Sequence, residues 1–123
     1  MCSSDLLRAC RDGRLGTLPS SGPKLRAGAA VHVVSAAEGY PGAPRKGDSI
    51  SIAGDFNDSW EKHGVRLFFA GVSRSGAGLV TNGGRVLGVT ALGANREEAR
   101  AKAYEWSTKV TFPGIQRRTD VGR

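Results

Sequence analysis

The chain has 123 residues, of which 39% are hydrophobic and 24% charged, which is enough for one globular domain. Its two cysteines exclude a disulfide framework and a zinc site, and no apolar run approaches the ~20 residues that a membrane-spanning helix needs. The net charge of +7 favours anionic partners, but no basic stripe is interleaved with aromatic residues, so nucleic acid is not the expected partner. We therefore expect a cytoplasmic protein with reduced thiols at Cys2 and Cys10.

The first 28 residues are predicted to form a short helix and a connecting segment. Residues 3–12 begin with serines that can cap a helix and carry Leu6 and Leu7, and Gly13 then ends the pattern. Residues 14–28 are rich in glycine, proline and serine, which is typical of a linker. The helix has no preceding segment to pack on, so we expect it to be the end of a larger unit.

Several strands are predicted after the linker. Residues 29–37 are nearly all apolar, which predicts a central strand buried on both faces, and we interpret His32 within it as a structural residue. Residues 49–52 alternate between polar and apolar, as in a half-buried strand. Residues 65–72 are rich in aromatic and β-branched residues, which also favours a strand.

The sequence TNGGRVLGVTALG at 81–93 is the most glycine-punctuated part of the chain. Its Asn82-Gly83 pair indicates a tight hairpin turn whose central residues need positive φ, so we predict Gly83 in the left-handed region. The apolar run that follows predicts a strand buried on both faces. The pattern therefore predicts that residues 79–81 pair with residues 85–92.

One long helix is predicted at residues 96–110. Asn95 is a suitable N-cap, and Glu98 three residues later makes a capping box. Four residues at helical spacing form one apolar face: Ala99, Ala103, Trp106 and Val110. We expect Trp106 to be the buried anchor of this face, and residues 115–121 to follow as a last strand or extended tail. Together these elements predict an α+β fold, an antiparallel β-meander with one main packed helix.

Two glycine-rich turns are the candidate binding features. Arg85 follows the turn at 82–84, near backbone N–H groups that the glycines leave uncovered, and such a place can receive a phosphate or a carboxylate. The turn EGYPG at 38–42 also exposes backbone N–H groups. An ordinary hairpin with one surface arginine explains the same pattern, so both interpretations stay open.

Residues for covalent or acid–base chemistry are not grouped in the sequence. There is no phosphate-binding P-loop, dinucleotide fingerprint or zinc spacing, and the two histidines lie in unrelated segments. We therefore predict no catalytic and no metal-binding residues in this chain. From the residues alone, it is a module with possible anion recognition.

An ordered set of motifs resembles a known enzyme family. The motifs are EGYPG at 38–42, KGD at 46–48, FFAG at 68–71, LVTNGGRVLGVTALG at 79–93, EEARAKAY at 97–104 and FPGIQRRTDVG at 112–122. In this order they are similar to the C-terminal domain of phosphoribosylamine–glycine ligase, also called glycinamide ribonucleotide synthetase, an ATP-grasp enzyme of purine biosynthesis. The resemblance covers residues 3–122, and its match at 79–93 is long and specific.

The resemblance implies a domain organisation. Residues 1–13 would be the terminal helix of an ATP-grasp body that this chain lacks, residues 14–28 a linker, and residues 29–122 the C-terminal ligase domain, of the rudimentary hybrid-motif type. The initiating Met would then fall inside the family's sequence, so we expect a truncated reading frame or a fragment.

The resemblance also implies a reaction. ATP and Mg²⁺ (or Mn²⁺) would activate glycine as an acyl phosphate, and the amine of 5-phosphoribosylamine would attack it to give glycinamide ribonucleotide. The nucleotide and metal ligands would belong to the ATP-grasp body, so this chain is expected to bind neither alone and to need the missing N-terminal and ATP-grasp domains as partners. Carried over to the matching positions, six residues would form part of the walls of the substrate cleft: Tyr40, Gly42, Asn82, Gly83, Gly84 and Arg85.

The chain departs from the family pattern at four positions. Phe69 and Val72 stand where His and Thr are usual, so no polar role is carried over to residues 69–72. Ile115 and Gln116 stand where Met and an aromatic or similar residue are common. Two other interpretations remain open. One is the C-terminal domain of another ATP-grasp carboxylase, against which the motif at 79–93 argues; the other is a non-enzymatic basic module that binds phosphometabolites or RNA.

Overall fold

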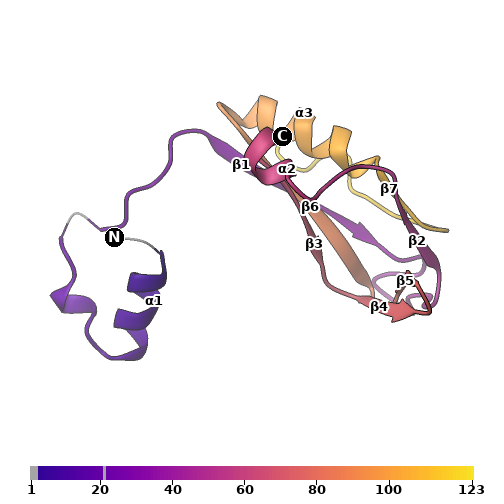
Figure 1. The fold of residues 1–123 in the computed structure, drawn as a ribbon, viewed down its shortest axis with the longest axis horizontal. Helices are drawn as coiled ribbons and strands as arrows, with labels where there is room; N and C mark the ends of the chain where they lie inside the picture. Colours follow the sequence, from indigo (N-terminus) through magenta and orange to yellow (C-terminus); the bar gives the residue numbers. More distant parts are fainter. Residues whose placement is uncertain (1–2, 21) are drawn as a thin grey trace.

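The computed structural model describes residues 3–20 and 22–123, and its main body consists of two antiparallel sheets and a helix (Figure 1). The first sheet has the order β1 (Ala29–Ala36), β6 (Arg85–Gly93), β3 (Val65–Phe69). The second has the order β4 (Val72–Ser75), β5 (Gly78–Thr81), β2 (Ser49–Ile52), β7 (Val110–Thr111). Helix α3 (Arg96–Ser107) packs on the first sheet. The predicted α+β class, with antiparallel strands and one main packed helix, is confirmed.

Three short helical segments lie outside this framework. Helix α1 (Ser3–Arg11), which confirms the predicted N-terminal helix, and the 3-10 turn Leu15–Thr17 stand apart from the sheets at one end of the molecule (Figure 1). Cys10 in α1 is exposed as a free thiol, whereas Cys2 lies outside the described residues. Helix α2 (Ser59–His63) was not predicted, because five residues are too few to show helical periodicity.

Two apolar clusters form the core. The first lies between the β1–β6–β3 sheet and α3, and its buried members are Val31, Val33, Val65, Val89, Ala91, Ala99 and Ala103. The second joins the two sheets, and its buried members are Ala37, Ile50, Val86, Leu87, Val110 and Phe112. Strand β6 contributes side chains to both clusters. Its continuous apolar run is therefore buried, as predicted.

The predicted pairing of residues 79–81 with residues 85–92 is wrong. Strand β5 pairs with β4 and β2, whereas β6 pairs with β1 and β3, so the turn carries the chain from one sheet to the other. Positive φ at Gly83 is also wrong. A Cβ atom on Gly83 would lie 3.0 Å from the Cα atom of Gly71, so glycine is used there for close backbone approach. Spacing in the sequence does not distinguish these two uses of glycine.

The strand predicted at 65–72 is divided between the sheets. The chain leaves the first sheet after Phe69, passes Gly71 and enters the second sheet at Val72. Strands β4 and β5 then form a hairpin that turns at Gly76, where φ is +59°. A pattern of β propensity reports extended backbone and does not report which sheet the backbone joins.

Strand β1 is an edge strand and not the central strand that its composition predicted. It pairs with β6 along its length and with Gln116 at Ala36, and burial alternates along it, so that Val31 and Val33 are buried while His32 is exposed. His32 is nevertheless hydrogen-bonded, since its Nδ1 lies 2.7 Å from the Thr90 hydroxyl. The structural interpretation of His32 holds, but the second face of its strand is left open.

Helix α3 ends at Ser107, three residues earlier than predicted, and Val110 belongs to β7. The hydroxyls of Ser107 and Thr108 donate to the carbonyls of Tyr104 and Glu105, which satisfies the last turn of the helix. Trp106 is only half-buried, with its ring 5.1 Å from that of Phe56 and 5.2 Å from that of His63. Trp106 packs against the edge of the first cluster, whereas Ala99 and Ala103 form the contact between α3 and the sheet.

The chain passes between the two sheets where Gly71 and Gly83 meet. This crossing allows a test of stability. A Cβ atom on Gly71 would lie 2.7 Å from Gly83 Cα, so we expect Gly71→Ala to cost about 1–3 kcal/mol of unfolding free energy. A Cβ atom on Gly78 meets nothing nearer than 3.8 Å, so Gly78→Ala is the matched control and should change stability by less than about 0.5 kcal/mol. Urea unfolding measures both, and equal stabilities would show that the crossing is not tightly packed.

Candidate functional site

The two glycine-rich turns singled out in the sequence lie side by side. The loop that follows β1 is fastened to the turn before β6 at both of its ends. At one end the Ala37 N–H donates to the Gly84 carbonyl at 2.8 Å; at the other, the Gly47 N–H donates to the Thr81 carbonyl at 2.7 Å. The loop therefore has a fixed position against β6, although residues 37–84 include the whole of four other strands.

Tyr40 is seated directly on Gly84. A Cβ atom on Gly84 would lie 2.4 Å from Cδ2 of the Tyr40 ring, so only glycine leaves room for the ring. The loop around Tyr40 is held by Arg45, which forms ion pairs with Glu38 and, at 2.8 Å, with Asp48. The hydrogen bond from Arg45 to Asp48 raises the pKa of that guanidinium. The ring is thus supported on one side and remains 40% exposed on the other.

A hollow of about 320 Å³ opens beside the Tyr40 ring, between the end of β1 and the C-terminal tail. Its lining residues are Val34, Ala36, Tyr40, Arg85, Gln116, Arg117 and Arg118. We call it the arginine hollow. Arg85 is exposed at its edge, and among the described residues no carboxylate forms an ion pair with it. Its charge is therefore available to an anion from outside the chain.

The tail is held in place by two reciprocal backbone hydrogen bonds of 2.9 Å between Ala36 and Gln116. Arg117 donates to the hydroxyl of Ser35 and to the carbonyls of Ser107 and Val110. Burial lowers the pKa of the Arg117 guanidinium. This arginine is therefore committed to joining β1, α3 and β7, and it is not a ligand-binding group.

Arg118, the neighbouring residue, has a different environment. It pairs with Asp120 through hydrogen bonds of 2.9 and 2.6 Å, and this arrangement lowers the pKa of Asp120 to about 2. Both side chains are exposed, so the pair is open to exchange with a ligand anion. Of the three arginines at the hollow, Arg85 and Arg118 can meet an anion from solution.

The structure brings together three of the six predicted site residues. Tyr40, Gly84 and Arg85 meet at the arginine hollow, whereas Gly42 packs against Gly39 within its own loop. Asn82 and Gly83 face the sheet crossing: the Asn82 side chain donates to the Ser73 hydroxyl at 2.7 Å, and Gly83 packs on Gly71. The six positions therefore do not form one surface.

Sequence reasoning missed the contribution of the tail, namely Gln116, Arg117 and Arg118. The available signal was the arginine pair within FPGIQRRTDVG, the densest basic group of the chain. Nothing in the spacing shows that this pair returns to the end of β1.

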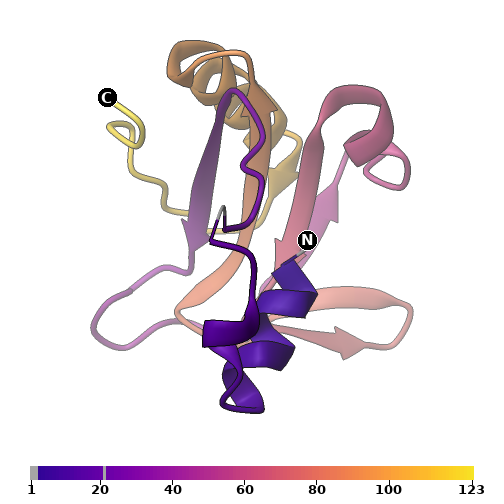
Figure 2. The same ribbon diagram turned by 90° about the vertical axis from the view of Figure 1, so that its left-hand side faces the viewer.

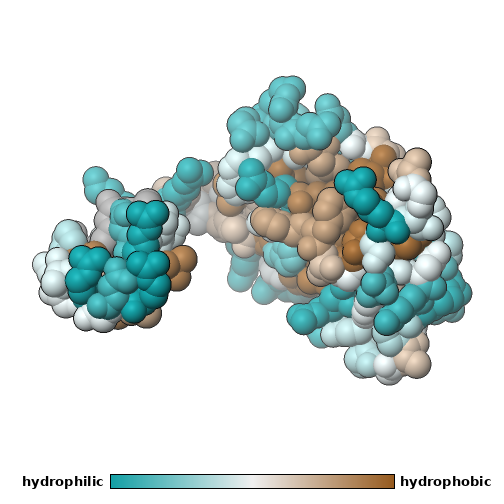
Figure 3. Space-filling model, turned by 60° about the horizontal axis from the view of Figure 1, so that its bottom comes forward, coloured by the Kyte–Doolittle hydropathy of each residue, from teal (hydrophilic) through white to brown (hydrophobic). Residues whose placement is uncertain are grey.

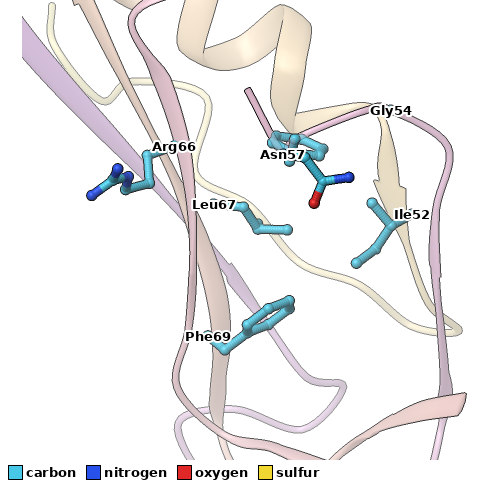
Figure 4. A pocket seen from close by; sticks show the side chains of 7 residues that line it. Ile52, Gly54, Asn57, Arg66, Leu67 and Phe69 are labelled. Atoms are coloured by element: carbon cyan, nitrogen blue, oxygen red, sulfur yellow. The ribbon is translucent and has the colours of Figure 1, made fainter. Parts of the chain in front are cut away.

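A second opening lies between β2 and β3 (Figure 4). This β2–β3 groove has a volume of about 550 Å³ and is lined by Ile52, Gly54, Phe56, Asn57, Arg66, Leu67 and Phe69. In Figure 4, Leu67 and Phe69 point across it toward Ile52, while Arg66 points away. None of the predicted site residues lines the groove, and its walls combine apolar side chains with the polar residues Asn57 and Arg66. Phe69, which stands where the family usually has His, is one of those apolar side chains.

The described residues contain no group of three or more His, Cys, Asp or Glu side chains placed to hold a metal ion. None of the described helices is both long enough and apolar enough to span a bilayer. What the arginine hollow offers is two accessible guanidinium groups and an aromatic ring. Guanidinium groups of this kind can bind an anionic ligand.

The fold is that of the C-terminal domain of an ATP-grasp ligase. The chain belongs to the family described as phosphoribosylglycinamide synthetase, C domain, whose model matches residues 30–123. It is 48% identical over 94 residues to phosphoribosylamine–glycine ligase of Thermotoga maritima, covering 76% of this chain and 21% of that protein. It is 42% identical over 118 residues to the enzyme of the same name from Synechocystis sp., covering 95% of this chain and 26% of that protein.

A solved structure agrees with this assignment. The crystal structure of phosphoribosylamine–glycine ligase from Thermotoga maritima superposes with a TM-score of 0.73 at 42% identity, over 94% of this chain and 27% of that one. The chain thus spans about a quarter of the length of its relatives, and the match extends beyond the family model into the N-terminal segment.

The two neighbouring arginines of the tail allow a matched test of the site's framework. Arg117→Met removes the donor for two carbonyls and a hydroxyl that are partly buried, so we expect it to cost about 1–3 kcal/mol. Arg118→Met removes only an exposed ion pair and should cost less than about 1 kcal/mol. Thermal or urea unfolding distinguishes them, and an Arg118 effect as large as that of Arg117 would contradict the roles assigned here.

Proposed function

We propose that this chain is the C-terminal portion of a phosphoribosylamine–glycine ligase. The whole enzyme would join glycine to 5-phosphoribosylamine at the expense of ATP, giving glycinamide ribonucleotide in purine biosynthesis. The observation that carries the proposal is that nearly the entire chain matches enzymes of this name, in sequence and in structure. It matches only about a quarter of each, so the activity belongs to a longer polypeptide or to an assembly.

In this proposal, ATP and Mg²⁺ (or Mn²⁺) bind to the part of the enzyme that this chain does not span. The donor set supports that division, since the described residues offer arginines and an aromatic ring and group no carboxylates for a metal. Phosphoryl transfer requires metal ions and cationic donors around the transferred group. The isolated chain is therefore proposed to be inactive.

The proposed role of this chain is to provide one wall of the substrate cleft. Tyr40 and Arg85 line the arginine hollow, and Gly84 gives the Tyr40 ring its seat. A phosphorylated sugar presents an anionic group for Arg85 and a ring for the aromatic face. The other predicted cleft residues, Gly42, Asn82 and Gly83, would act indirectly by fixing the two turns.

The proposal is tested by supplying the missing part. A fusion of this chain to the portion of the Synechocystis relative that it does not span should release ADP only when ATP, glycine and phosphoribosylamine are all present. The chain alone, assayed with the same substrates and Mg²⁺, should match a blank without protein. Glycine-dependent ADP release by the chain alone, or an inactive but folded fusion, would contradict the proposal.

The role of Arg85 is tested in the same fusion. Loss of one charge-assisted hydrogen bond is worth about 1.5–3 kcal/mol, so Arg85→Gln should lower kcat/KM for phosphoribosylamine by about 10- to 100-fold. Arg74→Gln is the control, because Arg74 is exposed on β4 and does not line the hollow. An Arg85→Gln enzyme with unchanged kcat/KM would remove this residue from the cleft.

A further inference from the structure

Helix α3 covers one face of the β1–β6–β3 sheet, and the opposite face is more exposed. On the inner face, cross-strand rows such as Val31–Ala91–Val65 and Val33–Val89–Leu67 face the core, which α3 covers. The alternate rows lie on the opposite face, which we call the outer face. These rows are Val34–Gly88–Phe68, His32–Thr90–Arg66 and Ala30–Leu92.

The outer face is built as a close-fitting surface. The His32 ring lies flat against the strand, since a Cβ atom on Gly88 would come within 2.4 Å of it. Its Nδ1 is tied to the Thr90 hydroxyl, and its ring meets that of Phe68 edge-on at 6.1 Å. Phe68 remains 49% exposed. The result is a patch in which the rows Val34–Gly88–Phe68 and Ala30–Leu92 lie on either side of one polar row, His32–Thr90–Arg66.

This composition does not fit a solvated sheet face. Antiparallel sheets with one face in water alternate polar and apolar residues, whereas near-continuous apolar strands are covered on both sides. Residues 29–37 and 86–92 are of the second kind. Within the described part of the chain, α3 covers the inner face, whereas on the outer face only the β6 residues Val86 and Gly88 are buried, and Ala30, His32, Arg66 and Phe68 are exposed. The β1 and β3 residues of the outer face therefore lack a cover among the described residues of this chain.

The position of the N-terminal segment indicates what the cover is. Figure 1 shows α1 standing apart from the sheet, and Figure 2, viewed from that side, shows α1 nearest the viewer, below β1 and level with the lower ends of β6 and β3. Leu7 of α1 and Leu25 of the linker are 70% and 89% exposed, so this segment also lacks its packing partner. Where the linker joins β1, a hollow of about 200 Å³ is lined in part by Ala30 and Leu92, which belong to the outer face.

We propose that the outer face is the surface on which the rest of the ligase polypeptide packs, with α1 belonging to that body and the linker spanning the junction. The inference rests on the proposed function. It names the occupant as the three-quarters of the relatives' length that this chain does not span. A stable contact of this kind buries about 800 Å² on each partner, so we expect it to extend across all three strands.

The same contact would close the substrate cleft. Val34 belongs to the outer face and also lines the arginine hollow beside Tyr40 and Arg85. A body seated on the outer face would therefore form the opposite wall of that hollow. Arg66 and Arg85 lie at the edges of the surface, and the chain carries a net charge of +7, so the facing patch should be apolar with an acidic rim.

Histidine modification provides the first test, because the two histidines of the chain lie in different places. His32 is on the outer face, whereas His63 is exposed at the end of α2 beside Trp106. In the isolated chain both should react with diethyl pyrocarbonate. In the fusion to the remaining part of the Synechocystis relative, we expect His32 to react about tenfold more slowly, because the centre of an interface excludes water, and His63 to be unchanged.

Adjacent phenylalanines on β3 provide the second test. Phe68 lies on the outer face and Phe69 faces the β2–β3 groove, and their exposures are similar, 49% and 54%. Both Asp variants of the isolated chain should fold, because both side chains are exposed. In the fusion, Phe68→Asp should return His32 to its isolated-chain reactivity, since it would bury a charge, and Phe69→Asp should not.

Other occupants give different results. If His32 reacts equally in the fusion and in the isolated chain, or if only Phe69→Asp disturbs the fusion, the outer face is not the packing surface. If the isolated chain dimerises and His32 is protected in that dimer, the occupant is a second copy, which also overturns the proposal. A fusion that protects His32 but has no ligase activity would keep the interface and remove the proposed function.

Discussion

Strand β6 is the element on which the rest of the structure depends, because glycines in and beside it let three neighbours approach its backbone. A Cβ atom would lie 2.4 Å from the His32 ring at Gly88, 2.4 Å from the Ala99 nitrogen at Gly93 and 2.4 Å from the Tyr40 ring at Gly84. These neighbours belong to the outer face, helix α3 and the candidate site, respectively. One glycine-spaced strand thus sets the spacing of all three parts. Figure 3 shows that hydrophobic residues gather on one face of the body.

Local patterns in the sequence predicted the elements well where the cause of the structure is itself local. Asn95 caps α3 by accepting a hydrogen bond of 2.8 Å from the Glu98 N–H, and Glu98 in return accepts one from Ala94. The choice of sheet was not predictable in this way. The crossing between the sheets depends on contact between Gly71 and Gly83, and nothing in the residues around either position names the other as its partner.

Only part of the candidate site was predictable, because local turns can be recognised in the sequence and contacts between distant segments cannot. Tyr40, Gly84 and Arg85 were found because each stands in a recognisable turn, and the resemblance to the family linked the two turns. The tail was missed because Gln116 reaches the end of β1 through hydrogen bonds between residues far apart in the chain. Asn82 was assigned to the cleft from its turn, yet its side chain is held by Ser73 on the other side of the crossing.

We propose that the exposed part of the outer face of the first sheet and the arginine hollow at its end together face the rest of a ligase. A crystal structure of this chain fused to the remainder of a relative tests that claim most directly. We predict that His32 and Phe68 will be buried against the added body, with Tyr40 and Arg85 opening onto the cleft between them. A structure in which the outer face stays in solvent while the body packs elsewhere would contradict the account.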